Sequence, residues 1–352
     1  MACPCTAPAT CAHGDNLLVA SALAHTRSAV VEAVQAAGAR ARQRGPVVEV
    51  DLAGEPADRV LSALAAALSG PELEEARVLD ALDERDDPVA AALLAPTLAE
   101  AAARTAEPEL AALLRAERSA FSSAYQPIVR LGDGAVVGHE ALLRARGPAG
   151  PIPPDRLFAA AARANWLAAL DRIGRETALR GARGWLGHDL LFVNFIPTTI
   201  YRPEVCLRTT ERAMADAGLR FGQVVFEVTE GERVRDVGHL EHVLDHYRAR
   251  GCKVALDDLG AGYSTLNLLV RLRPDVVKID REIVQALPGA TARTLIGAVV
   301  DIAASMGTTV LVEGVETPAQ AEAARDLGVD LAQGFLFGHP VPRHAPGAAP
   351  AA

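Results

Sequence analysis

Short hydrophobic runs alternate with segments of helical periodicity through most of the second half of the chain. The runs are rich in Val, Leu, Ile and Phe and predict buried strands, and the amphipathic segments between them predict helices. Strands alternating with helices are typical of parallel βα units, and about 220 residues of them fit one (β/α) barrel, although pattern alone leaves a doubly wound sheet open. The predicted strands are 190–194, 224–228, 253–257, 276–279, 309–313 and 334–337, and the predicted helices are 156–164, 168–183, 237–250 and 319–327.

The first 120 or so residues follow a different pattern. Apolar runs at 17–22 and 47–52, with helical segments at 25–37 and 57–68, predict a small α/β module. Residues 71–122 are acidic and are expected to be helical. We therefore expect four parts: a Cys-rich N-terminal segment (1–14), an acidic α/β and helical regulatory module (15–121), a barrel domain (122–343) and a flexible tail (344–352).

The formal net charge of −9 argues against a polymeric nucleic-acid partner, which requires a basic face. Residues 1–122 hold 18 acidic and 10 basic residues, whereas residues 123–352 hold 26 and 25, so the acidity belongs to the front of the chain. The nearly neutral second part can still hold a small anionic ligand through metal ions. Since no hydrophobic run reaches the roughly 18 residues that cross a bilayer, we expect a cytoplasmic protein without membrane insertion.

Polar residues lie where the predicted strands end. Ionisable groups are rare at such half-buried positions unless they are paired or used. In a (β/α) barrel the carboxyl ends of the strands form one rim, where active sites lie. The residues in question are Asn194, Glu227, Asp257, Asp258, Lys278 and Glu313, and Glu140 follows the short apolar run 136–137 and precedes a segment that looks helical.

These residue types indicate divalent cations. Carboxylate and amide oxygens are hard ligands that suit Mg²⁺ or Mn²⁺, and clustered carboxylates need cations to neutralise them. Two ions about 4 Å apart can activate a bridging water and hold both the attacking and the leaving oxygen of a phosphodiester. Lys278, one of only two lysines in the chain, offers an ammonium to the water or to the developing charge.

The motifs around these residues resemble those of EAL domains, the cyclic di-GMP phosphodiesterases. The segments YQPIV (125–129) and EALLR (140–144) resemble the opening of the family's sequence. The resemblance continues, over roughly 122–343, through VNF (193–195), EVTE (227–230), DDLGAGYS (257–264), VKID (277–280), EGVE (313–316) and QG (333–334).

The resemblance implies a modified (β/α)8 TIM-like barrel with one antiparallel strand, a homodimer formed through this domain, and hydrolysis of cyclic di-GMP to linear pGpG with two Mg²⁺ or Mn²⁺ ions. It also implies the roles of individual residues. The metal ligands are Glu140, Asn194, Glu227, Asp257 and Asp258, and the catalytic residues are Lys278 and Glu313. Substrate contacts are Gln126, Leu142, Arg144, Glu316, Gln333, Phe337 and Pro340, and a regulatory loop contains Gly260, Ala261, Gly262, Tyr263 and Ser264, with Glu230 as its anchor.

Other functions are compatible with parts of this pattern. A non-catalytic cyclic di-GMP receptor, or an EAL domain that acts only by binding another protein, remains the alternative, although the complete ligand set favours the enzyme. A diguanylate cyclase is disfavoured because no GG[DE]EF-like segment occurs.

The N-terminal segment carries a separate candidate site. Cys3, Cys5, Cys11 and His13 are four soft ligands within eleven residues, which can form a tetrahedral zinc site or help to hold an iron–sulfur cluster. The usual C-x2-C pair is missing, and an unstructured tail that carries thiols is the other interpretation.

Overall fold

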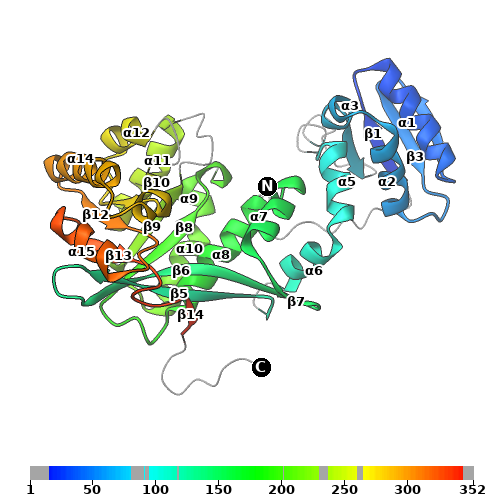
Figure 1. Cartoon of the computed structure of the whole chain (residues 1–352). Coiled ribbons are helices and arrows are strands. Elements are labelled where there is room, and N and C mark those ends of the chain that lie inside the picture. The colour runs from blue at the N-terminus through cyan, green and yellow to red at the C-terminus, as the bar shows by residue number, and fades with distance from the viewer. Residues whose placement is uncertain are drawn as a thin grey trace. The chain divides into compact units, whose positions relative to one another are not determined.

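The computed structural model describes residues 16–80, 91, 95–116, 119–200, 202–229, 237–259 and 265–343, with only the backbone described at Asp80, Thr229, Asp258, Thr265 and Leu266. Contacts divide these residues into two compact units (Figure 1). One unit contains the described residues up to 116 together with Asp155–Leu167, and the other contains 119–154 and 168–343. Among the described residues, no helix is both long enough and apolar enough to cross a membrane.

The N-terminal unit is built on a four-stranded antiparallel sheet. Its strands are β1 (Asn16–Ala20), β2 (Arg40–Arg44), β3 (Val47–Asp51) and β4 (Arg77–Asp80), in the order β2-β3-β1-β4. Helix α1 (Ala24–Ala36) joins β1 to β2, and α2 (Ala57–Ala67) follows β3, which gives the βαββαβ order of ferredoxin-like folds. The predicted small α/β module is therefore present, but β2 and β4 lie where the sequence pattern predicted no strand.

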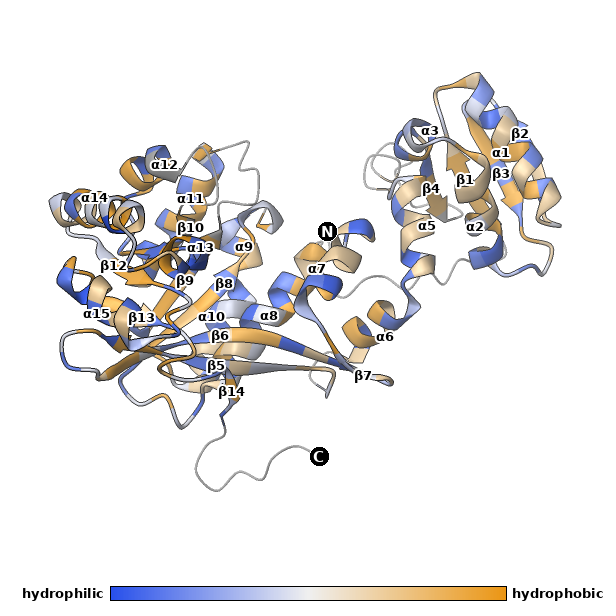
Figure 2. Ribbon diagram, viewed as in Figure 1, coloured by the Kyte–Doolittle hydropathy of each residue, from blue (hydrophilic) through white to orange (hydrophobic). Residues whose placement is uncertain are grey.

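Both missed strands lie at the edges of this sheet. β2 reads RARQR and carries Arg on the same face as the acidic residues of β3, a composition typical of protected edge strands. The four residues of β4 fall within 71–122, which the pattern assigned to helix, so that prediction is wrong at Arg77–Asp80. The core lies on the other face, where the apolar sides of β1 and β3 pack against α1 and α2 (Figure 2).

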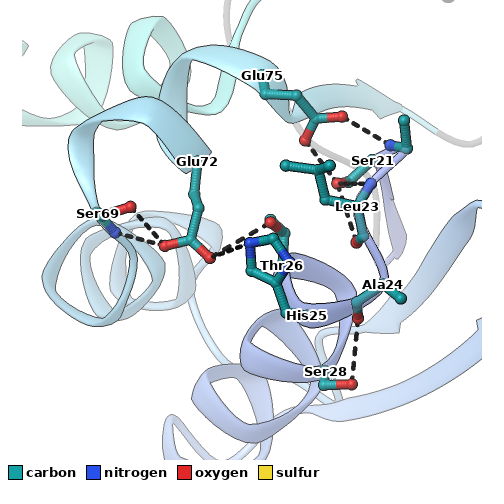
Figure 3. A network of polar contacts seen from close by, with 10 residues as sticks. Ser21, Leu23, Ala24, His25, Thr26, Ser28, Ser69, Glu72 and Glu75 are labelled. Atoms are coloured by element: carbon teal, nitrogen blue, oxygen red, sulfur yellow. Dashed lines mark hydrogen bonds and ion pairs between the residues drawn. The ribbon is translucent and has the colours of Figure 1, made fainter.

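A polar network fixes the start of α1 (Figure 3). Glu75, on α3 (Gly70–Glu75), accepts the backbone N–H of Ala22 and the hydroxyl of Ser21, both at 2.6 Å. Glu72 accepts the hydroxyl of Thr26 at 3.3 Å and caps its own helix through Ser69. Carboxylates at the amino end of a helix are favoured by its dipole, and they satisfy N–H groups that have no partner within the helix.

Helix α7 (Pro154–Arg163) groups with this unit although it lies within the predicted barrel domain. The residues after α7 bond to α5 (Leu98–Ala106). Asn165 donates to Glu100 at 2.9 Å, and Arg104 donates to the carbonyl of Ala164 at 3.0 Å. Arg163 pairs with Glu107, just before α6 (Pro108–Ala116). The division of the chain that the contacts give therefore differs from the boundary between residues 121 and 122 that the sequence motifs predict.

The second unit closes an eight-stranded barrel. The strands, in order around it, are β5 (Phe121–Arg130), β6 (Val136–Gly147), β8 (Leu190–Phe195), β9 (Val224–Thr229), β10 (Lys253–Leu259), β11 (Val276–Ile279), β12 (Thr309–Val312) and β13 (Leu331–Gln333). β5 pairs antiparallel with both β6 and β13, and the other neighbours are parallel. The predicted TIM-like barrel with one antiparallel strand is confirmed.

Two local predictions for the barrel are wrong. Glu140 lies in the middle of the long strand β6 and does not precede a helix. The last barrel strand is β13, and residues 334–337 form turns after it. Gly334 lies where two backbones approach closely, since a Cβ there would overlap the backbone of Val315.

Helices surround the barrel (Figure 1) and bury its outer face in one large hydrophobic core. Shorter strands, β7 (Gly150–Ile152) and β14 (Val341–Pro342), extend the sheet. The helices are α8 (Leu167–Gly181), α9 (Pro203–Cys206), α10 (Arg208–Ala217), α11 (Val237–Arg248), α12 (Thr265–Leu272), α13 (Arg281–Gln285), α14 (Ala290–Met306) and α15 (Pro318–Asp326), with short 3₁₀ turns at η2 (Pro197–Thr199) and η3 (Phe221–Gln223).

Candidate active site at the carboxyl end of the barrel

The interior of the barrel contains an apolar layer below a polar one. Ile128, Phe192, Val225, Ala255, Val276, Leu311 and Leu331 form the apolar layer. Because side chains alternate between the faces of a strand, the residue two positions nearer the rim points into the barrel as well. That residue is polar in every case, and with Glu140 of β6 these residues form the polar layer: Gln126, Glu140, Asn194, Glu227, Asp257, Lys278, Glu313 and Gln333.

Lys278 lies at the centre of the polar layer. Its Nζ is 2.6 Å from Glu313, 2.7 Å from Glu227 and 3.2 Å from Asp257, and 3.9 Å from Glu140. The side chain of Lys278 is 1% exposed, and a buried ammonium requires partners of opposite charge. One ammonium group therefore faces four carboxylates, and the acidic groups of the layer outnumber its basic group.

Burial and mutual repulsion shift the pKa values of this layer. Burial raises the pKa of Glu227 well above its ordinary value, against the opposing charge of Lys278. Burial likewise raises the pKa of Glu313 to about 8. Burial alone would lower the pKa of Lys278, but the charges of Asp257, Glu140, Glu227 and Glu313 outweigh it and hold that pKa well above the usual range. Lys278 is therefore charged at neutral pH, and Glu313 can exchange a proton there.

The donor set fits divalent cations. Carboxylates and the amide of Asn194 are the oxygen ligands that Mg²⁺ and Mn²⁺ prefer, and the buried Oε2 of Glu227 has no hydrogen-bond partner among the described residues. Asn194 donates to Glu140 Oε1 at 2.9 Å. In the described part of the chain, no three Asp, Glu, His or Cys side chains lie close enough together to hold one metal ion in their present conformations. Nζ of Lys278 lies between the carboxylates, so a bound cation would share these carboxylates with the ammonium.

The backbone changes register at the predicted pair of aspartates. The pairing of β10 with β11 shifts between Leu256 and Leu259, so that Asp257 and Asp258 lie at an irregularity of the strand. Asp257 is buried in the polar layer, and for Asp258 only the backbone is described.

Two glutamines hold Glu140. Gln333 donates through Nε2 to Glu140 Oε2 at 2.6 Å and to Gln126 Oε1 at 3.0 Å. Gln126 in turn donates to the carbonyl of Gly338 at 3.1 Å. Both glutamines are predicted substrate contacts; in the structure Gln333 bonds directly to the carboxylate of Glu140, and Gln126 bonds to Gln333.

A pocket of about 370 Å³ opens above the layer. Of the predicted substrate contacts, Leu142, Glu316, Pro340 and the two glutamines line it. Arg144 and Phe337 are not part of its lining: Arg144 donates to the carbonyl of Leu143 at 2.9 Å, and Phe337 packs against the hydrophobic core.

Arg281 and Phe335 line the pocket but were not predicted. Arg281 donates to Glu316 at 2.8 Å and lies across Gly314, where any Cβ would overlap its side chain. Phe335 is 50% exposed, and its ring lies 4.2 Å from that of His339, centroid to centroid. Each directly follows a quoted motif, VKID or QG, and that position was the only signal in the sequence.

Several predicted residues lie outside the described part of the chain. They are Glu230, Gly260, Ala261, Gly262, Tyr263 and Ser264 of the regulatory loop, and Cys3, Cys5, Cys11 and His13 of the soft-ligand cluster. Their roles stay predictions.

Comparison with known proteins gives consistent matches to the barrel. The sequence model of the EAL domain matches residues 110–340. An uncharacterised protein of Azorhizobium caulinodans is 36% identical over 251 residues, which are 68% of this chain and 34% of that protein, so the chain spans about a third of that relative's length.

The similar solved structures include two that were determined with cyclic di-GMP. That of the Pseudomonas aeruginosa MucR phosphodiesterase with cyclic di-GMP has a TM-score of 0.60 and 30% identity, and the match covers 66% of this chain and 97% of that one. That of Klebsiella pneumoniae BlrP1 with calcium and cyclic di-GMP has a TM-score of 0.57 and 28% identity, over 83% of this chain and 73% of that one. Both hold the same cyclic dinucleotide, and one also holds a divalent cation.

Proposed function

Since the chain belongs to the EAL domain family, we propose that it hydrolyses cyclic di-GMP to linear pGpG with two divalent cations, Mg²⁺ or Mn²⁺, held by the polar layer. The observation that carries this proposal is that each of the eight barrel strands brings one polar side chain to the same rim, with one ammonium among four carboxylates. Such a surplus of oxygen donors is what a site for divalent cations requires.

Glu140, Asn194, Glu227 and Asp257 would hold the cations, together with Asp258. Once bound, the cations would supply Lewis-acid activation of the phosphodiester and of the attacking water. The hydrogen bonds from Asn194 and Gln333 keep Glu140 in place before any cation arrives. Such outer hydrogen bonds orient ligands and support affinity.

Glu313 and Lys278 would serve the chemical step. Glu313 would accept a proton from the attacking water once cation binding has displaced the proton that burial favours on this carboxyl in the metal-free chain. Lys278 keeps its proton and offers a fixed positive charge to the phosphate as negative charge develops on it.

The pocket walls suit a cyclic dinucleotide. Arg281 brings a guanidinium to the pocket, where it can meet a phosphate, and Phe335 and Leu142 offer apolar surfaces against which a base can lie. Regulation by the N-terminal unit and a homodimer formed through the barrel belong to the same proposal.

The test uses the full chain purified with Mn²⁺ and cyclic di-GMP. We expect conversion to pGpG, detected by chromatography, and loss of at least 100-fold in kcat on Glu140→Ala, because a cation ligand and the acceptor of two hydrogen bonds disappear together. Glu282→Ala is the matched control, since Glu282 is an exposed carboxylate on α13 outside the polar layer. Tight binding of cyclic di-GMP without turnover in the wild-type chain would instead support the receptor alternative.

A further inference from the structure

A buried ion pair lies outside the barrel, where the proposed chemistry does not use it. Asp171 and Arg175 are one turn apart on α8, with side chains 2% and 1% exposed. Arg175 donates to Asp171 and also reaches the hydroxyl of Thr210 on α10 at 3.3 Å.

Asp171 also bonds to the segment that follows β8. Its Oδ1 accepts the backbone N–H of Ile196 at 2.8 Å, and its Oδ2 lies 2.9 Å from the hydroxyl of Thr199. That hydroxyl is also 2.8 Å from the carbonyl of Ile196, so the carboxylate and the threonine together close the turn.

This turn begins two residues beyond Asn194. The sheet holds the backbone of Asn194 opposite Glu227, but β8 ends at Phe195, after which pairing with the next strand stops. The side chain of Asn194 is exposed in the open end of the barrel and bonds to Glu140. Its position therefore depends on how firmly the end of β8 is held.

Stability alone does not account for the ion pair. Removing two charges from water costs about as much as their attraction returns, and well-packed apolar side chains would serve the core equally well. Two apolar side chains at positions 171 and 175 could not, however, bond to the N–H of Ile196 or to the hydroxyl of Thr199.

We propose that the Asp171–Arg175 pair is a positioning device for Asn194, which fixes the end of β8 and thereby sets the affinity of the polar layer for divalent cations. The proposal rests on the proposed function, because it takes Asn194 to be a cation ligand.

Two threonines make a matched test. Thr199 and Thr210 are both buried, and each places its hydroxyl against the ion pair, but only Thr199 connects it to β8. In the full chain, Mn²⁺ binding is measured by electron paramagnetic resonance, together with hydrogen exchange of the segment 192–200. We expect Thr199→Val to speed exchange at Ile196 and to weaken Mn²⁺ binding about tenfold, the low end of the cost of losing a ligand's own hydrogen-bond partner, because Thr199 acts on Asn194 only through the turn.

Thr210→Val is expected to change Mn²⁺ affinity less than twofold although it removes an equally buried hydroxyl. Thr199→Ser, which restores the hydroxyl, should recover the wild-type affinity, and Asp171→Asn should weaken binding as Thr199→Val does. Equal weakening by both valine variants would mean that the pair is merely structural and would overturn the inference, as would unchanged affinity in Thr199→Val.

The two hypotheses fail in different ways. If the wild-type chain binds no Mn²⁺, the proposed function falls and this inference falls with it. If the wild-type chain binds Mn²⁺ and hydrolyses cyclic di-GMP while the threonine variants behave alike, only the positioning role is wrong.

Discussion

A single ammonium faces the four carboxylates of the polar layer, and this imbalance controls how the site responds to pH. Burial raises the pKa of Glu313 to about 8, so in the metal-free chain this carboxyl carries a proton over most of the physiological range. Glu227 is shifted in the same direction by its burial. A cation binds ionised carboxylates, and its binding must therefore expel protons.

Mn²⁺ affinity should accordingly rise with pH. Release of a proton from Glu313, whose pKa is about 8, predicts a gain of at least about tenfold per pH unit between pH 6 and 7.5, and the raised pKa of Glu227 adds to this slope. Calorimetry in buffers of different ionisation enthalpy measures the protons released. The variant Glu313→Gln should lose about one proton from that count, and an affinity that stays constant from pH 6 to 8 would contradict the assignment.

At the scale of elements, the loop after β12 and the first turn of α13 fit together through one glycine. Gly314 has a φ of 66° and lies beneath the side chain of Arg281, which a Cβ would displace. The position is thus restricted twice, by backbone conformation and by space.

Gly314→Ala should raise the KM for cyclic di-GMP by about tenfold or more, because it displaces Arg281 from the pocket wall, and should destabilise the fold by about 1 kcal/mol through backbone strain. Steady-state kinetics and thermal unfolding measure the two effects. Gly307→Ala provides the control: its φ is 70°, and no atom lies within 4 Å of the added Cβ, so it should share the strain and leave KM unchanged. A similar rise in KM in both variants would count against a specific role for Arg281.

The parallel strands β8 to β12 could be predicted because they are buried on both faces, whereas β5, β6 and β13 were not among the predicted strands. Segments such as 190–194 and 224–228 read as continuous apolar runs, which parallel strands in a barrel require. β2 could not be recognised in this way, since an edge strand of Arg and Gln residues has no apolar face to display. Residues 334–337 have the composition of a strand, but in the structure they form turns, in which the N–H of Leu336 bonds to the carbonyl of Val315, distant in sequence.

Most of the candidate site could be predicted for the same reason. Each charged residue that ended an apolar run had to lie on the rim, and the quoted motifs supplied the glutamines. The position of Lys278 between the carboxylates could not be predicted, because it depends on side-chain rotamers across four strands. Arg281 and Phe335 lie beyond strand ends, where the path of a loop decides whether a side chain reaches the pocket.

At the scale of the whole molecule, the charge balance of the polar layer affects stability as well as chemistry. Lys278→Met would leave the buried carboxylates without their counter-ion, and removing one partner from a buried ion pair costs about 3–5 kcal/mol. We expect that loss in free energy of unfolding in EDTA, with partial recovery in Mn²⁺ as cations replace the ammonium. Denaturant unfolding in both buffers measures it.

The chain supplies its own control for this experiment. Lys253, the only other lysine, is 43% exposed and lies 3.9 Å from Asp275, so Lys253→Met should change stability by no more than about 0.5 kcal/mol. Equal stability of both variants in EDTA would mean that the carboxylates neutralise themselves by taking up protons.

The segment that contains α7 groups by contacts with the N-terminal unit although it lies within the barrel domain along the chain. The chain passes from one unit to the other between 116 and 119, again at 154–155, and a third time at 167–168. Shortening the chain from its amino end would keep the segment 155–167 but remove Glu100, Arg104 and Glu107, to which that segment bonds. The segment 155–167 is therefore joined covalently to the barrel at both of its ends, between β7 and α8, while its hydrogen bonds and its ion pair go to residues of the N-terminal unit.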